Sequence, residues 1–281
     1  MKNINEILDK NSEDTEDDEI DTKEQELQFN CASYNISQGT LNLVDGIECD
    51  ICKNKGKVAY VKDGYMRCKD CECMVKRKTF QRMKNCGIDR KVLEHYSFRN
   101  WKCENEWQNY LLNKCKEFYI EAKKHSNNYW FIVSGQSGSG KTHVCTALFQ
   151  ELIIGLNLGG VYFMWNDEIP KMLALRKSSY TDNQEKYEFK INELKNIDVL
   201  YIDDLFKLDK RYSEDSLSIA FEILNYRYIN NKITIISTEI EKNQFENIDV
   251  AIWGRCNEKT KNGNYWTTVV GAEKNYRIKG E

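Results

Sequence analysis

The chain of 281 residues has no stretch that approaches 18 consecutive apolar residues, which argues against a membrane-spanning helix. Its first residues are acidic and poor in apolar side chains, so we expect no signal peptide. Proline is nearly absent, with one residue, and no repeat or low-complexity tract follows the acidic start. Cysteine is plentiful, with 11 residues. Without a secretory signal, this number indicates a reducing cytoplasm, where thiols stay free or bind metal.

Charge is distributed unevenly along the chain. Residues 1–30 contain 11 Asp and Glu against 3 Lys, a net charge of −8, whereas the whole chain carries −3 and the remainder therefore +5. A segment so charged and so poor in aromatic residues is expected to be disordered. We therefore predict an acidic disordered tail over residues 1–45. We interpret it as a solubilising extension, with a partner-binding or DNA-mimicking arm as the alternative.

The most informative motif is a phosphate-binding loop. It follows the apolar run 129–133 and fits G-x-x-x-x-G-K-[ST] at every fixed position. Its glycines let successive N–H groups converge on the β-phosphate of ATP, while the lysine reaches the β and γ oxygens and the threonine hydroxyl binds Mg²⁺. Residues 143–154 are expected to form a helix whose positive end points at the nucleotide. We assign nucleotide binding to Gly135, Gln136, Ser137, Gly138, Ser139, Gly140, Lys141, Thr142 and His143.

Two acids at the end of a second apolar run supply the partner of this loop. Asp203 and Asp204 follow Val199–Ile202 directly. Acids at the end of a buried strand are costly to bury unless they face a cation. We expect Asp203 to hold Mg²⁺ together with Thr142, and Asp204 to orient or deprotonate the attacking water.

Apolar segments alternate with helical patterns from residue 103 onward. This alternation predicts an α/β fold, a P-loop NTPase core whose parallel sheet lies between helices. The predicted strands are 130–133, 161–165, 199–202 and 233–237, and the predicted helices are 103–125, 143–154, 168–177 and 214–229.

A cysteine pattern ahead of this core is typical of a zinc ribbon. Cys49 and Cys52 are followed, after fifteen residues, by Cys68 and Cys71, as in the template C-x₂-C-x₁₅₋₂₀-C-x₂-C. Residues 56–66 between the two pairs are predicted to form a hairpin. Cys73 could replace Cys71 as the fourth ligand, and free cytosolic cysteines are the alternative to a Zn²⁺ site. Because the segment has few apolar residues, zinc would contribute on the order of 10 kcal/mol to its folding.

Two basic segments are candidates for contact with nucleic acid. Residues 74–85 predict a basic helix that touches DNA phosphates or an acidic partner, or that is simply solvated. The loop after Asp204 adds basic side chains beside Tyr212, which favours single-stranded over duplex DNA, with an exposed charged loop as the alternative. The DNA-contacting candidates in this loop are Lys207, Lys210 and Arg211.

The order of the motifs resembles the DnaC/DnaI-type helicase loaders of bacteria and their phages, a branch of the AAA+ ATPases. Besides the phosphate-binding loop, the resemblance rests on the motifs Tyr-Ile-Asp-Asp-Leu-Phe, Leu-Asn-Tyr-Arg-Tyr, Thr-Ile-Ile-Ser-Thr, Gly-Arg and Lys-Asn-Tyr-Arg. The resemblance, from about residue 49 to 279, implies Thr238 near sensor 1, Arg255 as a finger acting on a neighbouring subunit, and Arg277 as sensor 2. One departure is that Glu239 follows Thr238, and the sensor 1 asparagine common in the wider family is absent.

These observations predict a helicase loader with three parts: the acidic tail 1–45, a zinc-binding and helicase-docking module 46–99, and an AAA+ ATPase domain 100–281. We expect it to self-associate, to bind a ring-shaped replicative helicase, and to place that helicase on single-stranded DNA through slow, partner-stimulated ATP hydrolysis. The alternatives are a transposition helper ATPase that binds duplex DNA, a non-hydrolysing ATP-binding adaptor, and a zinc-dependent nucleic-acid-binding protein.

Overall fold

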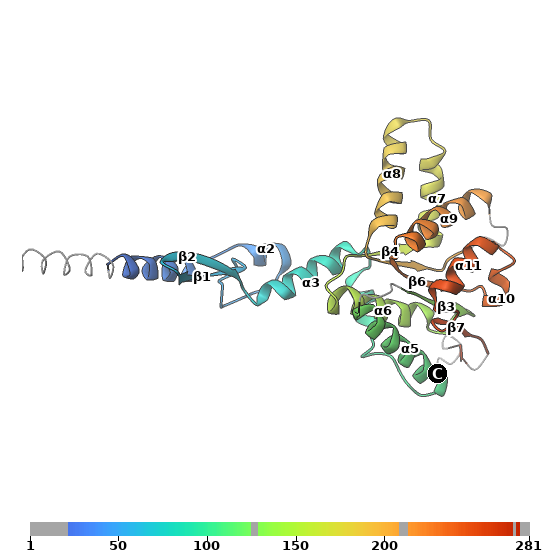
Figure 1. The fold of residues 1–281 in the computed structure, drawn as a ribbon, viewed down its shortest axis with the longest axis horizontal. Coiled ribbons are helices and arrows are strands. Elements are labelled where there is room, and N and C mark those ends of the chain that lie inside the picture. The colour runs from blue at the N-terminus through green and yellow to red at the C-terminus, as the bar shows by residue number, and fades with distance from the viewer. Residues whose placement is uncertain (1–21, 125–128, 208–212, 272–273, 276–281) are drawn as a thin grey trace, which may run out of the picture. The chain divides into compact units, whose positions relative to one another are not determined.

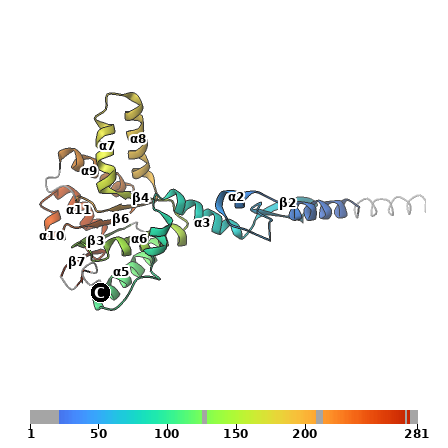
Figure 2. The same cartoon turned by 180° about the vertical axis from the view of Figure 1, so that it is seen from behind.

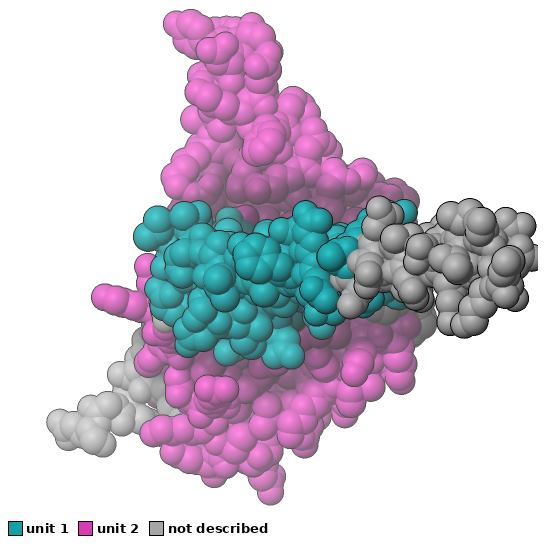
Figure 3. Space-filling view, turned by 90° about the vertical axis from the view of Figure 1, so that its left-hand side faces the viewer, with its two compact units in different colours: residues 1–81 teal, residues 82–281 magenta. Residues whose placement is uncertain are grey.

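The computed structural model describes residues 22–124, 129–207, 213–271 and 274–275, shown in Figures 1 and 2. The chain divides into two compact units, residues 1–81 and 82–281, which Figure 3 colours separately. Across the described ranges, no helix combines the length and the apolar character needed to cross a membrane. Lys210, Arg211 and Arg277, three of the predicted site residues, lie outside the described residues.

The first unit contains a two-stranded antiparallel hairpin. Strands β1 (Lys57–Lys62) and β2 (Tyr65–Asp70) pair along their whole length. The turn between them uses Asp63 and Gly64, whose φ angles of 53° and 69° are those of a tight hairpin turn. Helix α2 (Leu41–Asp45) precedes the hairpin and α3 (Cys73–Asn85) follows it. The predicted hairpin and the predicted basic helix are both present.

Residues 22–45 correct the prediction of a disordered tail up to residue 45. Residues 22–36 are helical, and α2 follows. Cys31 in this helix is buried, and the Asn35 amide pairs with both backbone groups of Ala59 in β1, at 2.8 and 2.9 Å. The amide thus extends the hydrogen bonding of the hairpin, a contact that composition does not reveal.

The second unit is built around a five-stranded parallel sheet in the order β4-β5-β6-β3-β7. Every residue of the three central strands is buried, as expected for a parallel sheet covered on both faces. The α/β prediction is confirmed, and the four predicted strands are present within one or two residues. The strands are β3 (Trp130–Gly135), β4 (Gly160–Met164), β5 (Val199–Asp203), β6 (Ile233–Thr238) and β7 (Trp266–Val269), of which β7 was not predicted.

Helices cover both faces of the sheet (Figures 1 and 2). Along β3, Phe131 and Val133 pack against one group of helices, and Trp130 and Ile132 pack against the other. The first face carries α5 (Glu106–Lys123) and α6 (Lys141–Gly155). The second carries α7 (Trp165–Arg176), α8 (Thr181–Asn196), α9 (Glu214–Ile229) and α11 (Val250–Lys259), while α4 (Arg90–His95) and α10 (Lys242–Phe245) are short.

The boundary between the units lies at residues 81/82, not at the predicted 99/100. Residues 82–99 belong to the ATPase unit because Cys86, Ile88 and Leu93 are buried in its core. The Gln150 amide of α6 also donates to the carbonyl oxygens of Leu93 and Tyr96, both at 2.9 Å. This segment therefore packs against α6, the helix that follows the phosphate loop.

Candidate nucleotide-binding site

The phosphate loop connects the C-terminal end of β3 to the first turn of α6. Gly135, Gly138 and Gly140 all have positive φ, between 77° and 120°, which other residues rarely adopt. A Cβ at Gly135 would lie 2.1 Å from the carbonyl oxygen of Val269 in the neighbouring strand. Glycine is thus required both by the backbone conformation and by the close approach of β7.

Lys141 is buried within the loop that it follows. Its Nζ donates to the carbonyl oxygens of Gly135 at 2.9 Å and Gln136 at 2.7 Å, so the loop curls around the ammonium group. Burial lowers the pKa of Lys141, although the carboxylates of Glu239 and Asp204 oppose this effect. An ammonium group held inside a glycine-rich turn is placed to neutralise phosphate oxygens.

Asp203, at the end of β5, is the most heavily hydrogen-bonded acid of the site. Thr142 Oγ1 donates to its Oδ1 at 3.3 Å, and Tyr201 donates to the same oxygen at 2.7 Å, as does Ser237. Tyr162 donates to Oδ2 at 2.8 Å. The set of one hydroxyl and one carboxylate from Thr142 and Asp203 fits Mg²⁺, which prefers oxygen ligands. The other three donors hold the carboxylate in one orientation.

Asp204 adopts a left-handed backbone conformation, with φ of 58°, that turns its side chain into the cleft. Its N–H donates to Ser237 Oγ at 2.9 Å, and its Oδ2 accepts from Lys207 Nζ at 3.0 Å. Burial raises the pKa of Asp204, with a contribution from the neighbouring Asp203 charge, and Lys207 partly offsets the rise. A carboxylate with a raised pKa at this place can accept a proton from water.

A cleft of about 410 Å³ extends from the phosphate loop to the segment before α5. His143 lies at its wall, where its Nε2 donates to the Ser97 carbonyl oxygen at 2.9 Å. The rings of Trp101 and Tyr96 lie 5.2 and 5.3 Å from the His143 ring. Burial lowers the pKa of His143, which keeps the ring neutral. An aromatic wall beside a phosphate loop is suited to a flat base.

Two of the remaining predicted site residues do not line the cleft. Thr238 Oγ1 donates to the Leu205 carbonyl oxygen at 2.8 Å and is fully buried, so among the described residues Glu239 lines the cleft in its place. Arg255 in α11 donates to Asn225 Oδ1 at 2.9 Å and is not one of the cleft-lining residues. Its role on a neighbouring subunit therefore stays a prediction.

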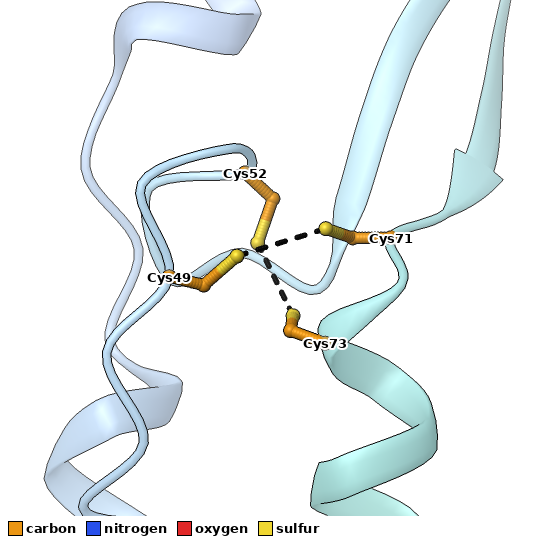
Figure 4. A group of neighbouring side chains, drawn as sticks. All are labelled: Cys49, Cys52, Cys71 and Cys73. Atoms are coloured by element: carbon orange, nitrogen blue, oxygen red, sulfur yellow. Dashed lines mark hydrogen bonds between the residues drawn. The ribbon is translucent and has the colours of Figure 1, made fainter.

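Four cysteines of the first unit converge around one point (Figure 4). The sulfur atoms of Cys49, Cys52, Cys71 and Cys73 all lie within 4.8 Å of one another. The distance between the first and third is 3.7 Å, and that between the second and fourth is 3.5 Å. Four sulfurs at about 2.3 Å from a tetrahedral Zn²⁺ would be separated by about 3.8 Å, so the cluster fits the ion.

The four clustered cysteines differ from the predicted ligand set, since Cys73 takes the place of Cys68. Cys68 is exposed and lies in β2, where it pairs with Ala59. The ladder continues to Asp70, so the chain leaves the hairpin only at Cys71, whose N–H donates to the Gly56 carbonyl oxygen at 2.8 Å. The second knuckle therefore begins three residues later than the spacing predicts.

One residue of the predicted DNA-contacting helix instead supports the cysteine cluster. Arg77 in α3 is 5% exposed, and its Nε lies 3.5 Å from Cys73 Sγ. Its guanidinium also pairs with Asp45 at 2.6 Å and donates to the Ile47 carbonyl oxygen at 2.7 Å. These contacts join α2 to α3 beside the cluster, so Arg77 is a structural residue of the first unit.

Comparison with known proteins agrees with this geometry. Residues 96–259, more than half of the chain, match the family described as the bacterial DnaA ATPase domain. The chain belongs to this family. Together with the helicase loader DnaC among the relatives, this match confirms the resemblance to DnaC/DnaI-type AAA+ loaders.

Several relatives extend the comparison. The chain is 28% identical over 245 residues to protein XkdC of the phage-like element PBSX of Bacillus subtilis, which covers 83% of this chain and 87% of that one. It is 30% identical over 132 residues to the replicative helicase loader DnaC of Escherichia coli K12, and this match covers 47% of the chain and 49% of DnaC. The match thus spans about half the length of that loader.

Solved structures share the fold. The crystal structure of DnaI gives a TM-score of 0.50 at 19% identity and covers 67% of this chain and 94% of DnaI. A replication initiator DnaA bound to AMPPCP and single-stranded DNA also gives 0.50 at 19% identity, over 67% of this chain and 53% of DnaA. At this identity the likeness establishes the AAA+ fold.

The sequence missed two groups of site residues. Tyr162, Tyr201 and Ser237 hold Asp203, and Tyr96 and Trp101 form the aromatic wall. The only available signal was Tyr201, which lies two residues before Asp203 and hence on the same face of the strand.

Proposed function

We propose that this DnaA-family ATPase binds and hydrolyses MgATP and uses that cycle to load a replicative helicase onto single-stranded DNA. The observation that carries the ATPase part is the meeting of Lys141, Thr142 and Asp204 in one cleft, with Asp203 hydrogen-bonded to Thr142. The loader part rests on the likeness to the E. coli helicase loader and to the PBSX phage-element protein.

The residues divide the work of hydrolysis among them. The amides of the phosphate loop and Lys141 would bind the β- and γ-phosphates, and Thr142 with Asp203 would hold Mg²⁺. The ion, when bound, neutralises charge on the phosphate oxygens. Asp204, with its raised pKa, would orient the attacking water and take its proton. The aromatic wall at Trp101 would cover the base and exclude water from one side.

The first unit is the proposed helicase-docking module. It exposes large apolar side chains on α2 and near the cysteine cluster, which suits an apolar partner surface. The exposed fractions are 82% for Leu43, 69% for Val44, 61% for Ile51 and 71% for Val75. Lys207, one of the predicted DNA-contacting residues, lines the cleft instead and pairs with Asp204 and Glu239. Lys210 and Arg211 remain proposed contacts for single-stranded DNA.

The loader hypothesis is tested with the replicative helicase that is encoded in the same genome. The full chain should co-elute with the helicase on gel filtration and increase its unwinding of a DNA fork coated with single-stranded-DNA-binding protein. Replacing Leu43 and Val44 with Glu should abolish co-elution, whereas Ile229→Glu, at a residue 65% exposed in the other unit, should not. Failure of the unmodified chain to bind the helicase at micromolar concentrations would refute the proposed partner.

We also propose that the ATPase self-associates and that Arg255 completes a neighbouring site. It lies on α11 with its guanidinium over the Phe221 ring, 4.8 Å from the centroid, and Ala251 accepts a second bond at 2.8 Å. Arg255→Ala should lower ATP turnover at least 10-fold, because arginine fingers contribute about 10³- to 10⁵-fold. Mixing it with inactive Lys141→Ala subunits should restore part of the turnover, and absence of any rescue would assign Arg255 a role within its own subunit.

The cysteine cluster is proposed to bind structural Zn²⁺ through Cys49, Cys52, Cys71 and Cys73. The purified chain should contain about one Zn²⁺ per molecule, measured by plasma mass spectrometry. Cys52→Ser should lose the metal, because it leaves only three thiolates. Cys68→Ser is the matched control and should retain it, since Cys68 lies outside the cluster. Zinc loss in Cys68→Ser with retention in Cys73→Ser would restore the ligand set predicted from spacing.

A further inference from the structure

Lys207 lies in the nucleotide cleft between two carboxylates. Its Nζ is 3.0 Å from Asp204 Oδ2 and 3.1 Å from Glu239 Oε1. The side chain is 28% exposed, and it lines the cleft together with Lys141 and Thr142. Lys207 is therefore placed where it can reach a nucleotide bound in the cleft.

The charges along the cleft place Lys207 where it can offset part of the charge of a triphosphate. The cleft is lined by two carboxylates, on Asp204 and Glu239, and by three ammonium groups, on Lys102, Lys141 and Lys207, of which Lys207 pairs with both carboxylates. A triphosphate brings about four further negative charges, of which Mg²⁺ neutralises two. Without Lys207, the Glu239 carboxylate would lose this ion-pair partner. Its negative charge would then repel the negative charge of the terminal phosphate.

The end of β6 does not itself provide a donor to the terminal phosphate. The Thr238 hydroxyl is committed to the Leu205 carbonyl oxygen, and it accepts from the Ile240 N–H at 3.2 Å. The carboxylate of Glu239, the next residue, accepts hydrogen bonds and donates none. Lys207 has three N–H donors and no acceptor, and Glu239 holds it at this place.

We propose that Lys207 binds the terminal phosphate of the nucleotide and thereby distinguishes ATP from ADP. This proposal rests on the ATP site proposed above. In the structure, Lys207 Nζ donates a hydrogen bond to the Asp204 carboxylate. On binding of a triphosphate, the ammonium group keeps Glu239 and exchanges Asp204 for a γ-phosphate oxygen, which frees the Asp204 carboxylate for the attacking water. With ADP no such exchange takes place, and Asp204 stays hydrogen-bonded to Lys207.

The test compares the affinities of the full chain for a non-hydrolysable ATP analogue and for ADP, both with Mg²⁺, by isothermal titration. Lys207→Met should weaken binding of the triphosphate at least 10-fold and change ADP binding less than 2-fold. Lys207→Arg should retain most of the triphosphate affinity, because arginine also carries charge and donors to a phosphate. Unchanged ADP affinity in the Met variant also shows that the site is still folded.

Lys232 provides a matched control. Its side chain is also 28% exposed and pairs with a carboxylate, Asp198, at 3.7 Å, but it lies at the opposite end of β6. Lys232→Met should change neither affinity. Equal loss of both affinities in Lys207→Met, or no change in either, would overturn the proposal while the ATP site stands. Failure of the unmodified chain to bind either nucleotide would refute the ATP site itself.

Discussion

Replacing Arg227 with methionine is expected to lower the free energy of unfolding of the ATPase unit by about 3 to 5 kcal/mol. Arg227 is 0% exposed, and its guanidinium donates to five backbone carbonyl oxygens and to Thr234 Oγ1. The acceptors belong to the end of α8, the residues before β5, and the start of β6. Methionine fills much of the volume but leaves these buried oxygens unpaired, at about 1 to 3 kcal/mol each before relaxation.

The expected loss is measurable because all six tryptophans lie in the second unit. Urea unfolding followed by tryptophan fluorescence thus reports on that unit, and the midpoint should shift to lower urea. Arg176→Met is the control, since the guanidinium of this arginine donates to the exposed Ser218 hydroxyl at 3.3 Å and lies 6.0 Å from the centroid of the Tyr187 ring. It should cost less than about 1 kcal/mol. Similar midpoints for the two variants would show that the Arg227 bonds are not needed to hold the sheet.

Lys141→Ala is expected to weaken MgATP binding at least 100-fold, equivalent to about 2.7 kcal/mol. The ammonium group is the positive charge at the centre of the phosphate loop, where it donates to the Gly135 and Gln136 carbonyl oxygens. Alanine would remove this charge and leave both carbonyl oxygens without their donor. Fluorescence titration with a labelled ATP measures the effect. Lys171→Ala is the control, because this lysine is 65% exposed and pairs with Glu168 on the surface. Equal affinities for both variants would contradict the role of the loop.

The sheet was largely predictable because its central strands are continuously apolar. Residues 130–133, 199–202 and 233–237 are buried throughout, and α9 begins and ends where its pattern predicts. Strand β7 was missed because it has four residues and is buried only at Trp266 and Val269. Helix α8 was missed because its sequence is mostly polar or charged, with buried residues only at Tyr187, Ile191 and Leu194.

The site was predictable where its chemistry is local in sequence. The phosphate loop and the pair Asp203 and Asp204 each occupy a single segment. Tyr162 reaches Asp203 only because the parallel register of β4 and β5 places it opposite Tyr201. The position of Lys207 depends on the turn at Asp204 and on Glu239 from another strand, so its place in the cleft could not be derived from spacing alone.

Spacing also misled at the cysteine cluster. The repeated C-x₂-C pattern favoured Cys68, but the β2 ladder holds that residue in the hairpin, away from Cys49 and Cys52. The length of strand β2 decides which cysteines meet, and the spacing between cysteines does not predict that length.

The most direct measurement is a crystal structure of the chain with Mg²⁺ and a non-hydrolysable ATP analogue. We expect the β-phosphate against Lys141, the ion between Thr142 and Asp203, the base beside Trp101, and Lys207 on the terminal phosphate. An empty cleft at saturating nucleotide, or an analogue bound elsewhere on the chain, would contradict the account.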